Sequence, residues 1–414
     1  MKGVKQMMPK KLSKALTCCL AAVLLFSATA CANKPAAEKS MHTGVELTHT
    51  KAENGKNIRL GAYVWYGYAN MAWQLYSERY MENLVDTLEP AWGYGYNEVA
   101  DMEYQIDLAV EYGLSFFAFE YWWNQKPTLH EKMGLDNFMK SKNNANLDFT
   151  LLVANHDTHR IYYDNWQEIC LEHFIPYMTK DNYLKVDGKP VISFFEPDFL
   201  IADLGGVERT KECFDWLRSQ MQEQGYPGVL ILAGDQSSSA PNYINNASTG
   251  VANVPAFQKR IANYLAAGYD AAHGSLTYRQ YIPNPGTDET RYLRSYDSLL
   301  DLHEKSWEVF AEHTDIPFAP GLASGWDDRL KWNVFSPPSY YYLEGKTPQR
   351  FYEHILKAHS YIQQNPDQAL GNIAYIYAWD ETDEGAYLIP TKAEGNDMLE
   401  AMRRAIDTIN AQNP

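Results

Sequence analysis

Basic residues are scarce in this chain relative to acidic ones, and metal-binding motifs are missing. The 414 residues include 36 Lys and Arg against 52 Asp and Glu, which gives a formal net charge of -16. Because proteins that bind nucleic acid rely on Lys and Arg to neutralise phosphates, this balance argues against that class. The histidines, cysteines and acids show no metal-ligand spacing such as His-x-x-x-His. The sequence therefore predicts no metal, and we expect no other cofactor.

Long hydrophobic runs are also missing, and aromatic residues are what the chain has in excess. After residue 31 no apolar run is long enough to span a bilayer. Aromatic residues make up 14% of the chain, with 11 Trp and 30 Tyr. Because aromatic faces stack on the C–H faces of sugar rings, this composition fits a protein that binds neutral carbohydrate. An acidic surface that serves solubility alone is the alternative.

The first 30 residues are expected to be a signal peptide. Five lysines precede a short apolar run at residues 16–26, which is followed by small residues up to Ala30. The cysteine that comes next, Cys31, resembles the lipidated cysteine of the lipobox in bacterial lipoproteins, where it receives acyl chains such as palmitate. Ordinary cleavage after Ala30 is the alternative.

We therefore predict three segments: a signal peptide at 1–30, a lipidated Cys31 with a flexible tether over 31–56, and a catalytic domain over 57–414. The lipid would hold a monomer in the bacterial cell envelope, outside the cytoplasm, with no other membrane contact. The cysteines that remain after processing, Cys170 and Cys213, are expected to be buried, unreactive thiols. A disulfide between them is the alternative.

From residue 58 onward, eight short apolar runs alternate with segments of helical periodicity. The expected strands are 59–64, 115–120, 149–154, 190–195, 229–233, 269–272, 316–320 and 373–378. The expected helices include 102–112, 166–178, 209–224, 296–312, 348–364 and 396–409. Because a helical stretch follows each strand, the pattern predicts an α/β fold, a single (β/α)8 TIM barrel with elaborated βα loops, rather than two domains.

Polar and aromatic side chains gather where these strands end. In such a barrel the carboxyl ends of the strands carry the active site. Aromatic rings there can stack on a sugar while carboxylates, amides and imidazoles bond its hydroxyls, so we predict a carbohydrate site. The predicted substrate-binding residues are Tyr63, Trp65, Glu120, Tyr121, Trp122, Asn155, His156, Glu196, Trp326, Asp327, Trp379 and Tyr387. Packing of the barrel rim is the alternative for the tryptophans, and internal salt bridges are the alternative for Glu120 and Glu196.

The densest acidic cluster follows the last strand, with four carboxylates between Asp380 and Glu384. Glycoside cleavage needs one carboxyl group that holds a proton and one that is ionised. Crowding of like charges raises the pKa of one group and so separates the two roles. Glu381 and Glu384 stand three residues apart, a spacing that aims both side chains the same way on a turn, and we predict them as the catalytic pair. A solvated loop or a helix N-terminus is the alternative.

Several stretches resemble motifs of family 99 glycoside hydrolases, the endo-α-mannosidase relatives, and of the related WbsX-type proteins. Residues 378–388, AWDETDEGAYL, are similar to the family segment NEW-x-EG. Four other stretches are similar to family motifs in the same order. They are 111–117 (YGIDGF in the family), 154–155 (WAN), 188–191 (GKPV) and 325–327 (GWDN). The resemblance extends over roughly residues 58–409, nearly all of the predicted catalytic domain.

The resemblance implies a metal-free (β/α)8 glycosidase that retains anomeric configuration, in a family whose characterised members cut α-mannosides internally. It implies that Glu381 takes the proton from the substrate's own 2-hydroxyl, which attacks the anomeric carbon. It also implies that Glu384 protonates the leaving oxygen and then activates water. Asp380 stands where the family has Asn, and Thr382 stands where it has an aromatic residue. The resemblance therefore does not fix which sugar is the substrate.

Two other functions remain as alternatives. WbsX-type relatives are often labelled glycosyltransferases, although nucleotide-sugar donors are cytoplasmic and the expected export argues against that activity. A non-catalytic glycan-binding lipoprotein would need the aromatic residues but not the two glutamates.

Overall fold

The computed structural model describes residues 44–65, 90–92, 98–123, 129–235, 254–274, 293–327 and 342–413. The side chains of residues 129–132, 235 and 383 are outside this description. The predicted signal peptide, Cys31 and residues 32–43 of the predicted tether also lie outside it. Within the described ranges, no helix combines the length and the apolar character that a membrane crossing requires.

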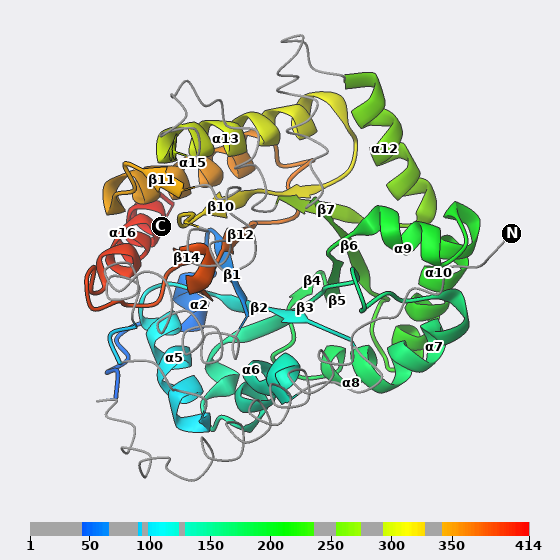
Figure 1. Cartoon of the computed structure of the whole chain (residues 1–414), viewed down its shortest axis with the longest axis horizontal. Helices are drawn as coiled ribbons and strands as arrows, with labels where there is room; N and C mark the ends of the chain where they lie inside the picture. Colours follow the sequence, from blue (N-terminus) through cyan, green and yellow to red (C-terminus); the bar gives the residue numbers. More distant parts are fainter. Residues whose placement is uncertain are drawn as a thin grey trace, which may run out of the picture. The chain divides into compact units, whose positions relative to one another are not determined.

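Parallel strands form the centre of the fold. They are β1 (Arg59–Val64), β2 (Phe116–Tyr121), β3 (Asp148–Val153), β5 (Lys189–Phe194), β6 (Leu230–Asp235), β7 (Ala271–Gly274), β9 (Phe318–Ala319), β10 (Gly321–Ala323) and β12 (Ile373–Tyr377). Hydrogen bonds join them in the order β10, β12, β1, β2, β3, β5, β6, β7, β9. Because only Pro320 separates β9 from β10, this order closes into a barrel (Figure 1). The predicted TIM barrel is confirmed, with β9 and β10 together as its seventh strand.

Helices surround the barrel (Figure 1). They are α5 (Val99–Glu111), α6 (Leu129–Lys140), α7 (Trp166–Ile169), α8 (Ile175–Met178), α9 (Pro197–Asp203), α10 (Val207–Glu223), α12 (Val254–Ala267), α13 (Tyr296–His313), α15 (Pro348–Gln364) and α16 (Asp397–Gln412). Helix α15 has the predicted bounds because the Thr347 side chain accepts the N–H of Arg350 and Pro348 occupies the first turn. The predicted helix 166–178 is divided, since the π-helical turn Cys170–Phe174 lies between α7 and α8.

Smaller strand pairs accompany the barrel. Strand β4 (Lys185–Val186) pairs antiparallel with β5, and β8 (Leu293–Ser295) pairs parallel with β11 (Tyr342–Glu344). Strands β13 (Asp380–Glu381) and β14 (Ala386–Tyr387) form an antiparallel hairpin directly after β12. This hairpin carries the acidic cluster.

The predicted end of the tether at residue 56 is wrong, because the segment before it is part of the folded domain. Helix α2 (Lys51–Asn54) begins at Thr50, which forms a capping box with Glu53. Asn54 is fully buried, and its Nδ2 donates to the carbonyl of Val110 on α5 at 2.6 Å. Arg403 of α16 donates to Asn54 Oδ1 at 2.7 Å. These contacts tie residues 50–54 to two helices of the barrel.

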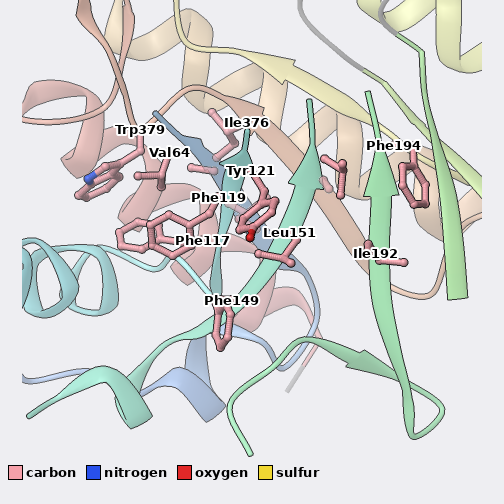
Figure 2. Packing of buried hydrophobic residues seen from close by; sticks show 14 of the residues in the cluster. Val64, Phe117, Phe119, Tyr121, Phe149, Leu151, Ile192, Phe194, Ile376 and Trp379 are labelled. Atoms are coloured by element: carbon pink, nitrogen blue, oxygen red, sulfur yellow. The ribbon is translucent and has the colours of Figure 1, made fainter. Parts of the chain in front are cut away.

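Side chains of the barrel strands alternate between the barrel interior and the layer under the helices, as the two-residue period of a strand requires. On β2, Phe117, Phe119 and Tyr121 pack in the helix-facing layer, whereas Phe116 and Ala118 pack inside the barrel. Figure 2 shows Phe117, Phe119 and Tyr121 of β2 among the buried residues of the helix-facing cluster. This alternation decides which of the predicted site residues can face a substrate.

Gly61 on β1 makes room for the ring of Phe116 inside the barrel. A Cβ at Gly61 would lie 2.0 Å from the ring of Phe116, which is fully buried and packs edge-on against Tyr375. We expect Gly61→Ala to lower the free energy of unfolding by about 1–3 kcal/mol, because the core must shift to accept the methyl group. Denaturant titration measures this. Gly55→Ala, where the nearest atom is 3.4 Å away, is the control, and equal losses in both variants would contradict the argument.

Buried histidines make the stability of the domain sensitive to acid. Burial lowers the pKa of His303 to about 3, and its Nδ1 donates to the carbonyl of Gly321 at 2.9 Å. Since the unfolded chain binds the proton with a pKa near 6.5, stability is lost as the pH falls from about 6.5 towards 3, by roughly 1.4 kcal/mol per pH unit at most. We expect His303→Gln to flatten this slope in denaturant titrations between pH 7 and 4. His313→Gln, at a partly exposed histidine, should leave the slope unchanged; equal slopes in all three proteins would contradict this assignment.

Cys170 and Cys213 are free, buried thiols, as predicted. Burial raises the pKa of the Cys170 thiol well above its usual range and that of Cys213 to about 11. Because the thiolate is the reactive form, both residues are unreactive at neutral pH.

Candidate active site

The β13–β14 hairpin is fixed to the barrel by backbone contacts on both sides. The N–H of Trp379 donates to the carbonyl of Tyr63 at 2.7 Å, and the carbonyl of Trp379 accepts from Leu388 at 2.9 Å. Asp380 Oδ1 accepts the backbone N–H of Trp65 at 2.9 Å, so the acidic segment is tied to the end of β1. The hairpin therefore lies at the carboxyl end of the barrel, where this fold carries its chemistry.

The acidic cluster is buried, so the alternative of a solvated loop is wrong. Asp380, Glu381 and Glu384 are 4%, 3% and 8% exposed. Glu381 ends β13, and Glu384 ends the short 3-10 helix Thr382–Glu384. Buried carboxyl groups are rare unless hydrogen bonds or a function maintain them.

Tyr377, the last residue of β12, contacts one of the two glutamates directly. Its hydroxyl donates to Glu384 Oε2 at 2.7 Å. Burial raises the pKa of Tyr377 well above its ordinary value, and the charges of Glu381, Glu384 and Glu120 raise it further. The hydroxyl therefore remains a protonated donor at any working pH. The three carboxyl groups therefore lie near enough to Tyr377 for their charges to affect its hydroxyl, and Glu384 contacts it directly.

Glu120 belongs to this region because of its position on β2. It alternates with Phe117, Phe119 and Tyr121, so it faces the interior and not the helices. It is partly exposed, unlike the two glutamates of the hairpin. A third carboxyl group, from a strand two places away in the barrel order, thus completes the acidic set.

Two glycines allow the loop after β10 to touch the β13–β14 hairpin. The N–H of Asp327 donates to the carbonyl of Glu384 at 2.6 Å. Gly385 has φ +63°, and a Cβ there would lie 2.6 Å from the Cβ and N of Asp327. A Cβ at Gly325 would lie 2.8 Å from the carbonyl oxygen of Gly385. Glycine at both positions therefore sets where Glu384 stands.

Aromatic rings enclose Tyr377 inside the barrel. Trp326 stacks on Tyr377 with centroids 5.9 Å apart and an angle of 21°. Tyr63 meets the Tyr377 ring edge-on at 5.9 Å, and its hydroxyl lies 2.7 Å from Nδ1 of His273. Burial lowers the pKa of His273 to about 4, so its imidazole is neutral at physiological pH. These contacts hold Tyr377 and the carboxylate that it bonds in one orientation.

A series of partly exposed rings continues along the neighbouring strand ends, and we call Trp65, Trp122, His156 and Phe195 the aromatic arc. Trp65 lies 6.4 Å from Trp122, which meets His156 edge-on at 4.9 Å. His156 in turn lies 5.1 Å from Phe195. The four rings follow β1, β2, β3 and β5, which are adjacent in the barrel. Such a row suits an extended ligand with repeated apolar faces.

Two predicted site residues face the helices instead of the site. Tyr121 is 1% exposed, and its hydroxyl lies 3.0 Å from Nδ1 of His173. Trp379 is fully buried beside Phe117, and its indole N–H donates to Gln105 of α5 at 2.8 Å. Figure 2 places both rings in the helix-facing layer. Their predicted contact with substrate is therefore not supported by their positions.

Two further predictions also differ from the structure. Asn155 is 1% exposed and exchanges two hydrogen bonds with the backbone of Glu196, at 2.8 and 2.9 Å, so it positions Glu196. Tyr387 of β14 is buried, and the ammonium of Lys346 lies 4.1 Å from its ring centre. Lys346 also pairs with Glu394 at 3.2 Å. Asn155 and Tyr387 thus support the loops and do not line the acidic region.

The remaining predicted residues keep positions at the strand ends: Tyr63, Trp65, Glu120, Trp122, His156, Glu196, Trp326, Asp327, Glu381 and Glu384. Tyr377 and Phe195 were not predicted. Strand alternation could have found both, since Tyr377 follows the interior positions 373 and 375, and Phe195 follows 191 and 193. In the described part of the chain, no group of three or more His, Cys, Asp and Glu side chains could hold a metal ion.

Two curated relatives match the sequence. Both are named "Uncharacterized protein WxcX", from Xanthomonas campestris pv. campestris strains ATCC 33913 and B100, and each is 24% identical over 319 residues. Each match covers 74% of this chain and 41% of the relative, so the chain spans about two fifths of the length of these relatives.

Two solved structures resemble the fold, and a family model covers most of the sequence. A structure titled "Glycoside hydrolase-like protein" is 13% identical, with a TM-score of 0.54 over 89% of this chain and 98% of its own. The GH99 endo-α-mannosidase from Bacteroides thetaiotaomicron, in complex with bis-tris-propane, is 12% identical, with a TM-score of 0.51 over 86% and 98%. At these identities the likeness concerns the fold alone. The model of the family described as "Glycosyltransferase WbsX" matches residues 87–402. The chain therefore belongs to the WbsX family and has a glycoside hydrolase-like barrel.

Proposed function

We propose that this protein is a retaining glycoside hydrolase that cleaves an external polysaccharide or glycan. The observation that carries the proposal is the buried pair Glu381 and Glu384 at the carboxyl end of the barrel, where Glu384 accepts the hydrogen bond of the Tyr377 hydroxyl. The fold shared with a GH99 endo-α-mannosidase supports it, and α-mannosides are the first substrates to test.

The proposed reaction moves one proton at each glutamate. The Glu381 carboxylate takes the proton of the substrate's 2-hydroxyl, whose oxygen attacks the anomeric carbon. The glycosidic oxygen leaves with the proton that Glu384 held. In the second step Glu384 accepts a proton from the water that opens the anhydro sugar, and Glu381 returns its proton to the 2-oxygen. Two inversions retain the anomeric configuration. Fixed proximity of the 2-oxygen to the anomeric carbon favours the first step.

The residues around the pair would serve this chemistry by position. The Tyr377 hydroxyl holds Glu384 in one orientation, and the backbone contact with Asp327 fixes the loop that carries it. The aromatic arc would stack on successive sugar units next to the bond that breaks, since its rings follow four adjacent strands.

Product analysis tests the proposed function. Purified protein is incubated with yeast α-mannan, plant polysaccharides and bacterial polysaccharides, and products are identified by mass spectrometry. NMR of the first anomer formed distinguishes retention from inversion. Products of retained configuration support the proposal. Inverted products contradict the mechanism, and the absence of products from every polysaccharide, with binding retained, favours the non-catalytic alternative.

A glycosyltransferase is the second candidate, because the description of the family carries that name. Sugar transfer that depends on an added nucleotide-sugar donor would support it. The same products formed without any donor would contradict it.

The proposed location is the bacterial cell envelope, with Cys31 acylated. The basic and apolar composition of residues 1–30, followed by Cys31, supports this proposal. Metabolic labelling with an alkyne fatty acid should label the wild-type protein and not Cys31→Ser. Equal labelling of the two proteins would contradict lipidation at this residue.

A further inference from the structure

We propose that a groove on the flank of the barrel is a second glycan-binding site, separate from the acidic region. The groove lies between the short helix Tyr163–Asn165, α7 and α10, and has a volume of about 440 Å³, within the ~300–1,000 Å³ range of small-ligand sites. Its lining includes Tyr163, Asp164, Trp166, Gln167, Glu212 and Trp216. The choice of a glycan as the occupant rests in part on the proposed function.

Aromatic surface is the first feature that fits a sugar. Tyr163 is 44% exposed, and the Arg209 guanidinium lies 5.1 Å from its ring centre, which holds the ring in place. Trp216 is partly exposed on α10. Trp166 is almost fully buried, and its indole N–H donates to the carbonyl of Cys213 at 3.0 Å, so this ring forms a rigid floor. Rings in fixed orientation bind a sugar face at little entropic cost.

The charges of the groove favour a neutral ligand. Asp164, Gln167 and Glu212 are exposed at the groove and offer oxygens that accept hydrogen bonds from sugar hydroxyls. The two carboxylates of Asp164 and Glu212 outnumber the Arg209 guanidinium at the Tyr163 ring, which disfavours phosphate and other anions, and the chain as a whole has a net charge of -16. Aromatic faces beside hydroxyl acceptors therefore point to a neutral glycan and not to a nucleotide or a nucleic acid.

Exposed apolar residues concentrate on this flank. Six large hydrophobic residues of the described chain are classed as exposed, and four of them belong to residues 162–199: Tyr162, Tyr163, Leu171 and Phe199. Phe199 lies on α9, which begins directly after Glu196 at the barrel end. Arg160 lies 4.4 Å from the Phe199 ring centre and pairs with Asp203 of the same helix. Exposed rings thus occur both in the groove and on the helix that begins at the barrel end, and a glycan bound in the groove would help to retain a polymeric substrate.

Affinity electrophoresis in native gels tests the site independently of catalysis. Each variant is made in a Glu384→Gln background, and gels contain yeast α-mannan, barley β-glucan or rhamnogalacturonan. Tyr163→Ala and Trp216→Ala should each weaken retention about five- to tenfold, because each removes one stacking ring. Leu265→Ala is the matched control, since Leu265 is 42% exposed on α12, outside the groove. Thermal unfolding shows whether each variant is folded. If Trp216→Ala does not fold, Tyr163→Ala still tests the site, because Tyr163 is exposed.

The outcomes separate the two proposals. Retention that the groove variants lose and Leu265→Ala keeps supports the second site, even if the wild-type protein forms no products. Retention equal in all variants, or no retention of the Glu384→Gln protein by any of the three polysaccharides, overturns it. In otherwise wild-type protein, Trp216→Ala should slow cleavage of the polymer several-fold and leave cleavage of a trisaccharide unchanged.

Discussion

Glu381→Gln and Glu384→Gln are each expected to lower glycan cleavage by about 10²–10⁴-fold, the usual contribution of a general acid or base. The amide keeps the size of the side chain but can neither take up a proton as a carboxylate does nor hold one for the leaving oxygen. Because Gln still offers an oxygen, the Tyr377 hydroxyl keeps an acceptor in Glu384→Gln. Initial rates on the best polysaccharide substrate measure the loss, and denaturant titration should show little change in stability.

The two variants should differ on an activated substrate. A glycosyl fluoride needs no proton on its leaving group, so Glu384→Gln should recover much of the first step, whereas Glu381→Gln should not. Asp380→Asn is the control, since an amide oxygen can still accept the N–H of Trp65 and Asn is the residue that related motifs carry there. Near-normal rates in both glutamate variants would remove the basis of the hydrolase proposal. Equal recovery of both on the fluoride would contradict the division of roles.

The barrel could be predicted because its strands and helices differ in period and length. Each strand is a short apolar run, and the start of helix α15 is marked by the N-cap residue Thr347 and by Pro348 in the first turn. The break at Pro320 left the seventh strand recognisable as one run, although the structure divides it into β9 and β10. The packing of residues 50–54 against the barrel could not be predicted. These residues are polar, so no hydrophobic pattern marks them, and Asn54 is buried through hydrogen bonds with Val110 and Arg403.

The sequence predicted that the acids lie at the barrel end, but it did not predict which way the aromatic side chains face. Residues after a strand were assigned to the site by position, without asking which way each side chain faces. Strand alternation sends Tyr121 under the helices and Glu120 inside, and the turn after β12 sends Trp379 towards α5. Asn155 is a different case, since its amide bonds the backbone of a residue 41 positions away, and a partner that distant leaves no local sequence pattern.

Gly385→Ala is expected to lower glycan cleavage about 10²-fold while most of the domain stays folded. A methyl group at this position would lie 2.6 Å from the N and Cβ of Asp327. Relief requires the hairpin and the loop after β10 to separate, which weakens the 2.6 Å bond from the Asp327 N–H to the Glu384 carbonyl. The Glu384 carboxyl then leaves its place beside Tyr377. A displacement of about 1 Å at a reacting group can cost 10²-fold in rate.

Gly371→Ala separates this collision from backbone strain. Gly371 has φ +56° and Gly385 has φ +63°, so alanine is strained at both, by about 1–2 kcal/mol. A Cβ at Gly371 would meet no atom within 4 Å, in contrast to position 385. Both variants should therefore lose stability in denaturant titrations through the shared strain, Gly385→Ala should lose more because of the collision, and only Gly385→Ala should lose activity. If the two variants kept the same rate, the contact between the two loops would not be what positions Glu384.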